Sequence, residues 1–175
     1  DKDMAKVLFS QEELQTRIRE LGAQLSEDYR GKTPTMVCIL KGAIMFYTDL
    51  VRSMDIPLTM DFMAVSSYGN STKSSGEVEI RKDLSTSIEG KHVVIVEDIV
   101  DSGFTLTYLT RLLNTRGAKS IKLCTLLDKP SRRAPGITLR ADYSGFAVGN
   151  EFVVGYGLDY DQLGRSLKDI YVVTE

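Results

Sequence analysis

Acidic and hydroxyl-bearing side chains gather in one short stretch of the chain. Glu97, Asp98 and Asp101 place three carboxylates within five positions, and the sequence Ser-Gly-Phe-Thr follows at 102–105. Carboxylates this close repel one another unless a cation or a polyol ligand compensates their charge. The glycine permits a tight turn between two hydroxyl groups. This stretch therefore suits a ligand that carries hydroxyls or Mg²⁺ at one end and a phosphate at the other.

The elements on either side of this stretch would place it at the edge of a sheet. Four β-branched residues in a row begin at Val93 and predict a buried strand over residues 92–96, and leucines at helical spacing predict a helix over 105–116 that Gly117 ends. Ligands of α/β proteins bind at the carboxyl ends of such strands, and helix N-termini favour anions. Acids that merely cap a strand and a helix would account for one carboxylate here, but three make that interpretation improbable.

The rest of the chain alternates strands with helices, which predicts an α/β fold with a parallel sheet flanked by helices. Ser10 and Glu13 have the spacing of a capping box, and apolar residues then recur at helical spacing to position 25. The polar stretch 66–76 predicts a long flexible loop of the kind that forms lids. We expect further strands over 35–40, 58–65, 120–127, 137–148, 151–156 and 170–174, and a further helix over 42–54.

Composition limits the possible classes of protein. The 175 residues fit a single domain, 1–175, and 22 basic residues against 24 acidic ones give a net charge of −2. This balance argues against nucleic-acid or membrane-surface partners, which favour a basic face. The first residues lack the apolar core of a signal peptide, and Cys38 and Cys124 lie in apolar runs typical of buried free thiols. We therefore expect a cytoplasmic protein.

Three common catalytic patterns fail on spacing. Gly31-Lys32-Thr33 could end a Walker motif, but the first glycine of that motif would fall on Ser26. The dinucleotide-binding pattern of three spaced glycines follows no predicted strand. The single histidine, His92, stands at the beginning of a predicted strand, which disfavours a serine–histidine triad and excludes a site of several histidines.

Residues 94–106 resemble the signature with which type I phosphoribosyltransferases bind phosphoribosyl pyrophosphate. Four further motifs occur in the family's order, and together they are similar to the branch that acts on hypoxanthine and guanine. They are Leu-Lys-Gly-Ala at 40–43, Ser-Ser-Tyr-Gly at 66–69, Leu-Asp-Lys-Pro at 127–130, and Phe-Val-Val-Gly-Tyr-Gly-Leu-Asp-Tyr at 152–160. The resemblance implies the type I phosphoribosyltransferase fold, with a small hood built from the two chain ends.

The same resemblance implies a reaction of purine salvage. The enzyme would transfer 5-phosphoribosyl from phosphoribosyl pyrophosphate to N9 of hypoxanthine, and of guanine, giving IMP or GMP and pyrophosphate. It implies Mg²⁺ as cofactor, 6-oxopurine bases as the other substrates, and a homodimer or homotetramer. The ranking of hypoxanthine, guanine and xanthine, and the choice between dimer and tetramer, stay open.

Carried over motif by motif, the resemblance also assigns residues. Asp101 would be the general base or acid facing N7 of the purine, Glu97 and Asp98 would hold the ribose hydroxyls directly or through Mg²⁺, and Asp159 would contact a second Mg²⁺. The other implied substrate-binding residues are Lys41, Gly42 and Arg165 for pyrophosphate, Ser67 and Tyr68 in the closing loop, Ser102, Gly103, Phe104 and Thr105 for the 5′-phosphate, and Lys129, Phe152 and Val153 for the purine.

Several of these residues have ordinary alternatives. Lys41 could be a lysine at a strand end, and Phe152 could be a core side chain. Phe104 stands where some relatives carry lysine, so a 5′-phosphate here would depend on backbone amides and hydroxyls. The family often has a cis peptide bond before the residue that corresponds to Lys41.

The alternative from another class is a regulator that shares the fold but binds RNA or DNA. Such a protein should show a basic face and need not keep the purine contacts. This chain is slightly acidic and keeps the motifs, and Arg132 and Arg133 with Lys129 form its one basic cluster. We interpret that cluster as a solvated turn or an assembly surface.

Overall fold

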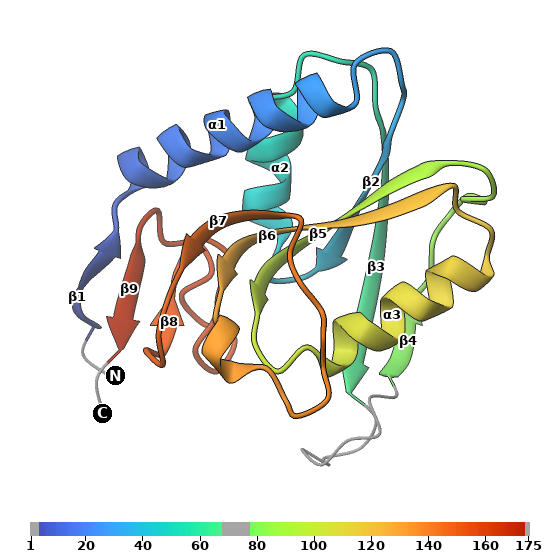
Figure 1. Cartoon of the computed structure of the whole chain (residues 1–175). Coiled ribbons are helices and arrows are strands. Elements are labelled where there is room, and N and C mark those ends of the chain that lie inside the picture. The colour runs from blue at the N-terminus through green and yellow to red at the C-terminus, as the bar shows by residue number, and fades with distance from the viewer. Residues whose placement is uncertain (1–3, 68–77, 174–175) are drawn as a thin grey trace.

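A six-stranded sheet forms the centre of the fold (Figure 1). The computed structural model describes residues 4–67 and 78–173. Neighbouring strands pair in parallel, except that β3 and β4 are antiparallel at one edge. The predicted parallel sheet is confirmed, with one antiparallel edge strand added. In spatial order its strands are β4 (Val78–Lys82), β3 (Thr59–Ser67), β2 (Thr35–Leu40), β5 (His92–Val100), β6 (Ser120–Asp128) and β7 (Tyr143–Ala147).

Helices cover both faces of this sheet. The helices α1 (Gln11–Asp28) and α2 (Ile44–Arg52) lie over one face, and α3 (Phe104–Thr115) lies over the other (Figure 1). Because successive residues of a strand point to opposite faces, Met36 and Cys38 of β2 pack in the core beneath α1 and α2, whereas Val37 and Ile39 pack beneath α3. This burial on two faces explains why the central strands are almost continuously apolar.

The first helix begins at the predicted capping box. The Ser10 hydroxyl accepts a hydrogen bond from the backbone N–H of Glu13 at 3.1 Å, and the Glu13 carboxylate accepts one from the backbone N–H of Ser10 at 2.8 Å. Two of the N–H groups at this helix end are thereby satisfied.

The two ends of the chain meet in a second, antiparallel sheet of order β1-β9-β8, at the left of Figure 1. Its strands are β1 (Met4–Phe9), β9 (Ile170–Val173) and β8 (Val153–Val154). The backbone N–H of Gln11 donates to the Asp169 carboxylate at 2.6 Å, which joins the start of α1 to this sheet. The expected hood from the chain ends is confirmed.

Several predicted strand bounds were wrong. The sequence patterns missed β1 and β4, and they extended β7 and β8 beyond Tyr143–Ala147 and Val153–Val154. They also ended β5 too early, because the strand continues to Val100 and contains Glu97 and Asp98. The two acids therefore lie within the strand and not after it.

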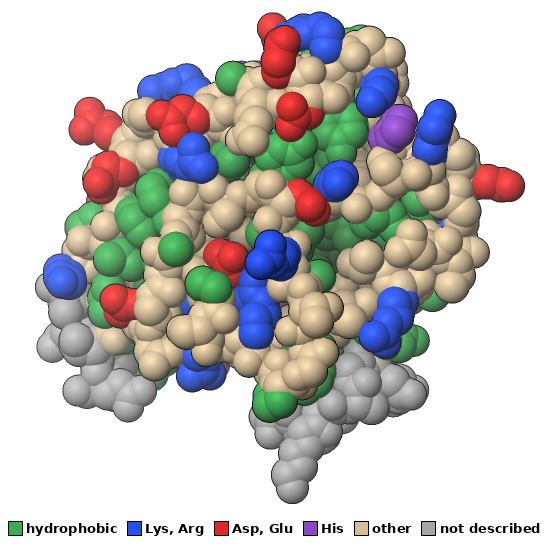
Figure 2. Space-filling model, in the orientation of Figure 1, with side chains coloured by type: hydrophobic (Ala, Val, Ile, Leu, Met, Phe, Trp, Pro, Cys, Tyr) green, Lys and Arg blue, Asp and Glu red, His purple; other side chains and the backbone are tan. Residues whose placement is uncertain are grey.

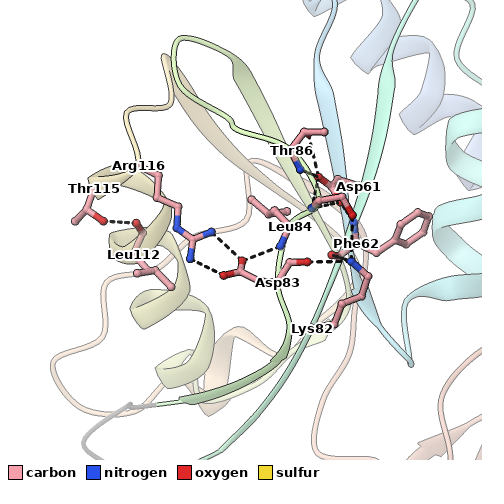
Figure 3. Close-up of polar contacts among 10 residues, drawn as sticks. Asp61, Phe62, Lys82, Asp83, Leu84, Thr86, Leu112, Thr115 and Arg116 are labelled. Carbon is pink, nitrogen blue, oxygen red and sulfur yellow. Dashed lines mark hydrogen bonds and ion pairs between the residues drawn. The ribbon is translucent and has the colours of Figure 1, made fainter.

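The connection between β4 and β5 is fixed by two carboxylates (Figure 3). Asp61 of β3 is 3% exposed and accepts backbone hydrogen bonds from Ser85 at 3.0 Å and Thr86 at 3.2 Å. Asp83 accepts two hydrogen bonds from the guanidinium of Arg116, at 2.8 and 2.9 Å. The edge of the sheet beside β4 is thereby held to both β3 and the end of α3.

No helix among the described residues is long and apolar enough to cross a membrane. On the face shown in Figure 2, acidic and basic side chains are interspersed and no broad field of one sign covers it. This distribution agrees with the net charge of −2.

Candidate functional site

A cavity of about 300 Å³ opens at the carboxyl ends of β2 and β5. The end of β3 and the first turn of α3 complete its wall. It is lined by Ile39, Leu40, Gly42, Val65, Ser66, residues 97–103, Thr105 and Leu106. The sheet thus brings together residues that lie far apart in the sequence, and most of the polar ones come from the stretch 97–105.

Within this cavity, a turn joins β5 to α3. Gly103 has a φ of +89° and is the residue that precedes the helix, with no side-chain cap. A Cβ at this position would lie 2.8 Å from Cγ2 of Ile137, so both the backbone conformation and the close packing require glycine. The first N–H groups of α3 have no partner inside the helix, and the helix dipole favours an anion there. The turn therefore leaves free N–H groups from which an anion could accept hydrogen bonds.

The two acids of β5 both line the cavity and are partly enclosed by protein atoms. Burial raises the pKa of Glu97 well above its usual value, and the neighbouring Asp98 raises it further. Burial also raises the pKa of Asp98, although a hydrogen bond with Glu97 and one from the backbone N–H of Ile99, at 2.6 Å, act in the opposite direction. The pair therefore favours ligands that remove the repulsion, such as a divalent cation or the hydroxyls of a sugar.

The end of β2 lies directly against these acids. The peptide bond between Leu40 and Lys41 is cis, as the resemblance implied. A Cβ on Gly42 would overlap the carboxylate of Asp98, and a Cβ on Gly157 would overlap the carbonyl of Gly42. Glycines at 42 and 157 thus allow β5, the end of β2 and a loop after β8 to approach closely at one place.

That loop carries the predicted residues Asp159 and Arg165. The guanidinium of Arg165 donates to the carbonyl of Gly157 at 2.7 Å and lies 3.6 Å from the carboxylate of Asp159. Its charge also opposes the rise in the pKa of Asp98, after the effects of burial and of the local hydrogen bonds. Arg165 is therefore near enough to act on the charge of Asp98, and its partner Gly157 packs on Gly42 just after β2.

Among the described residues, no group of three histidine, cysteine, aspartate or glutamate side chains is close enough to hold a metal ion. Glu97 and Asp98 form one pair, and Asp159 lies apart from them with Arg165 and the backbone N–H of Gln162, at 2.8 Å. The oxygen chemistry of the pair suits Mg²⁺, which usually takes one or two protein carboxylates and completes its shell with water and substrate oxygens. The residues fit an ion shared with a substrate and do not fit a metal centre made by the protein alone.

A second group of predicted residues borders the cavity on the β6 side. The backbone N–H of Lys129 donates to the carbonyl of Val100 at 2.9 Å, which places it beside Asp101. Its side chain is largely buried and donates from Nζ to the carbonyl of Glu151 at 2.8 Å. Phe152 is 49% exposed and meets Tyr160 edge-on, whereas Val153 is buried.

The structure therefore gathers most of the predicted residues into two adjoining groups. The cavity contains Gly42, Glu97, Asp98, Asp101, Ser102, Gly103 and Thr105, and its border contains Lys129, Phe152, Val153 and Arg165. Lys41 is exposed and directly follows β2, next to the cavity residues Leu40 and Gly42. Phe104 is the half-buried first residue of α3. Ser67 is the last residue of β3, and Tyr68 lies outside the described residues.

One interpretation from the sequence was wrong. Arg133 is not part of a solvated basic turn, because its side chain is only 14% exposed and its guanidinium is bound to its neighbours. Arg132, next to it, is more exposed and donates from Nε to the carboxylate of Asp101 at 3.1 Å. A pair of arginines after a buried strand gives no periodic signal, so only the folded chain shows which of the two turns inward.

Comparison with known proteins agrees with this geometry. The phosphoribosyl transferase domain family matches residues 6–161, and the chain belongs to that family. A hypoxanthine-guanine phosphoribosyltransferase of Bacillus subtilis is 55% identical over 98% of this chain and 94% of its own length. A crystal structure of a hypoxanthine phosphoribosyltransferase from Staphylococcus aureus has a TM-score of 0.93 and 49% identity, covering 97% of this chain and 91% of that one.

A longer relative matches as well. The bifunctional protein TilS/HprT of Listeria innocua is 57% identical over 98% of this chain. This chain spans 26% of the length of that relative.

Proposed function

We propose that this chain transfers the 5-phosphoribosyl group of phosphoribosyl pyrophosphate to N9 of hypoxanthine or guanine, and that it acts in purine salvage. One observation carries the proposal. The acids of β5 and the glycine turn before α3 meet the end of β2 in a single cavity, and Lys129 adjoins it from β6. A sugar phosphate, a pyrophosphate and a 6-oxopurine each find groups of matching chemistry there.

In this reaction the bond between C1′ and N9 forms as the bond between C1′ and the pyrophosphate oxygen breaks. The sugar develops oxocarbenium character, as in other glycosyl transfers. The 5′-phosphate would lie at the N-terminus of α3, held by backbone N–H groups and by the hydroxyls of Ser102 and Thr105. The departing pyrophosphate would lie between Lys41 and Arg165, whose cationic groups stabilise its charge. Holding both ends of the sugar fixes C1′ in line with the base.

The purine is oriented by the second group of residues. An ammonium is only a donor, so Lys129 can bind O6 of hypoxanthine or guanine. Phe152, half exposed at the border, provides a surface on which the ring can stack. As N9 forms its new bond, the proton on N7 passes to the carboxylate of Asp101, which leaves the purine neutral.

Glu97 and Asp98 would bind the 2′ and 3′ hydroxyls, directly or through Mg²⁺. When bound, Mg²⁺ supplies positive charge that stabilises the pyrophosphate as it leaves. Asp159 is the proposed contact for a second ion. Ser67 and Tyr68 would belong to the loop that closes over the site and keeps water away from the oxocarbenium-like sugar.

The test is a steady-state assay of the unmodified chain with phosphoribosyl pyrophosphate and one of four bases, adenine, hypoxanthine, guanine or xanthine. Both products, the nucleotide and pyrophosphate, are quantified. We expect transfer to hypoxanthine and guanine that stops in excess chelator and returns with Mg²⁺. Equal use of adenine would move the protein to another branch of the family. Transfer to no base, together with salt-dependent binding of RNA or DNA, would favour the regulator and overturn the proposal.

A further inference from the structure

Arg133 joins the two halves of the candidate site. It follows the short 3₁₀ helix η1 (Pro130–Arg132) that comes after β6. From Nη1 the guanidinium donates to the carbonyl of Asp101 at 3.1 Å and to that of Lys129 at 3.2 Å. A single nitrogen thus bridges the backbone of the proposed proton acceptor and the backbone of the proposed O6 donor.

The other nitrogens of Arg133 fix the guanidinium itself. Nε donates to the carbonyl of Leu139 at 3.1 Å, and Nη2 donates to the carboxylate of Asp128 at 2.8 Å. The side chains of Arg133 and Asp128 are only 14% and 15% exposed, so solvent screens this pair weakly. The fork of donors in a guanidinium is rigid, and an ammonium could not occupy the same four acceptors at once.

The place of this contact in the sheet explains its importance. The parallel pairing of β5 with β6 ends at Val100 and Asp128, so Asp101 and Lys129 are the first residues beyond the ladder. There the strands could separate. The backbone hydrogen bonds from Lys129 to Val100 and from Ala134 to Ser102 join the two segments. Arg132 reaches the side chain of Asp101, whereas Arg133 binds the backbone carbonyls of both Asp101 and Lys129. The Cδ of Arg133 would also lie 3.4 Å from a Cβ on Gly103, so its stem packs behind the turn before α3.

We propose that Arg133 is a positioning residue that sets the spacing between Asp101 and Lys129, and through that spacing determines which purine the enzyme uses. The inference rests on the proposed function. Arg133 touches neither reacting atom, and it acts through the backbone of the two residues that face N7 and O6. A shift of about 1 Å in such groups can cost about 10²-fold in rate.

Two variants test this inference. Arg133→Met keeps the length of the side chain and removes every donor, whereas Arg133→Lys keeps a charge for Asp128 and loses the fork. Arg30→Met is the matched control, because Arg30 is an exposed arginine that pairs with Glu27 and Asp55. For each protein, kcat and KM are measured with hypoxanthine and adenine, and Tm is recorded.

We expect Arg133→Met to lower kcat/KM for hypoxanthine by about 10- to 100-fold. The ratio of kcat/KM for hypoxanthine to kcat/KM for adenine should fall as well. Arg133→Lys should show the same fall in this ratio to a smaller extent, and it keeps the test valid if the methionine variant fails to fold. Arg30→Met should keep the ratio of the unmodified enzyme. A purely structural role for Arg133 would lower Tm and reduce activity with both bases equally.

The outcomes separate this inference from the proposed function. If the unmodified protein transfers phosphoribosyl to hypoxanthine but the Arg133 variants keep its base ratio, the inference alone is overturned. If the unmodified protein transfers it to no purine, the proposed function fails and the inference fails with it.

Discussion

The acids of the cavity differ in their surroundings, and this difference suits them to different chemical roles. Glu97 and Asp98 are packed beside each other, with pKa values raised by burial. The side chain of Asp101 is 47% exposed and pairs with Arg132 at 3.1 Å. A carboxylate that solvent and substrate can both reach is suited to proton transfer, whereas a partly buried pair that lines the cavity is suited to holding hydroxyls or a cation.

The first prediction concerns Asp101. Asp101→Asn keeps the shape of the side chain but removes its capacity to take the N7 proton. General acid–base catalysis contributes about 10²–10⁴-fold in rate, so kcat should fall by that order. Binding of phosphoribosyl pyrophosphate, measured by calorimetry, should change little. Asp55→Asn is the control, because Asp55 is exposed and pairs with Arg30 away from the cavity. An unchanged kcat in Asp101→Asn would show that Asp101 is only a structural acid of the turn.

The second prediction concerns Lys129 and the choice of base. Facing the 6-amino group of adenine, the ammonium of Lys129 would meet a donor with a donor. Sites built on such hydrogen bonds discriminate by about 10⁴–10⁵-fold, so adenine should be a very poor substrate. Lys129→Gln keeps a donor and adds an acceptor. It should lower kcat/KM for hypoxanthine and reduce the difference between the kcat/KM values for hypoxanthine and adenine.

The measurement is kcat/KM with both bases. Lys91→Gln is the control, because Lys91 is exposed and precedes the opposite, amino end of β5. Comparable kcat/KM values for adenine and hypoxanthine in the unmodified enzyme would exclude this role for Lys129.

At the scale of elements, the edge of the sheet depends on a buried carboxylate. Asp61 accepts hydrogen bonds from the backbone N–H groups of Phe62, Ser85 and Thr86 (Figure 3). Burial acts to raise the pKa of Asp61, but these hydrogen bonds together lower it below the usual 3.8. The stability that Asp61 contributes is therefore present above pH 3.8 and is lost as the pH falls through the lower pKa of the folded protein.

The third prediction follows from this arrangement. Asp61→Asn would turn an amide N–H toward backbone N–H donors and leave part of them unsatisfied. We expect a loss of about 1–3 kcal/mol in the free energy of unfolding at pH 7, measured by urea denaturation. The difference from the unmodified protein should shrink as the pH falls below 3.8. A difference that stays constant down to pH 2 would show that the charge of Asp61 does not contribute.

At the scale of the whole molecule, the hood has to stay in place over the sheet. Tyr156 lies in the loop after β8 with a φ of +52°, and its hydroxyl donates to the carboxylate of Asp49 in α2. Gln15 of α1 donates to the same carboxylate at 3.0 Å. Burial, and then the hydrogen bond to Asp49, raise the pKa of Tyr156, so the hydroxyl stays a donor. This contact joins the hood to both helices on one face of the sheet.

The fourth prediction is that Tyr156→Phe loosens the hood over the end of β2. The next residue, Gly157, packs on Gly42 and binds Arg165, so the proposed pyrophosphate contacts should weaken more than the base contacts. KM for phosphoribosyl pyrophosphate should rise several-fold with a smaller change for hypoxanthine, and the free energy of unfolding should fall by about 1–3 kcal/mol.

Tyr171→Phe in β9 is the matched control, since its hydroxyl makes no hydrogen bond among the described residues. An equal rise in both KM values for Tyr156→Phe would contradict the separate support of the pyrophosphate side.

Local patterns of the sequence determined the elements that depend on local chemistry. The β-branched run from Val93 predicted β5, the spacing of Ser10 and Glu13 predicted the start of α1, and His92 indeed lies at the amino end of β5, 2.6 Å from the Ser120 hydroxyl. The stretch from Glu97 to Thr105 predicted the cavity, because its acids, hydroxyls and glycine are neighbours along the chain.

The tertiary structure decided what depends on distant partners. Strand β1 exists because it pairs with β9 at the other end of the chain, and β4 (whose alternation of Val78, Glu79 and Ile80 gave a weak signal) exists because β3 offers it an edge. No spacing along the chain could show that Gly42 lies against Asp98. The inward turn of Arg133 was likewise invisible, because its acceptors come from β6 and from loops that only the folded sheet brings to one place.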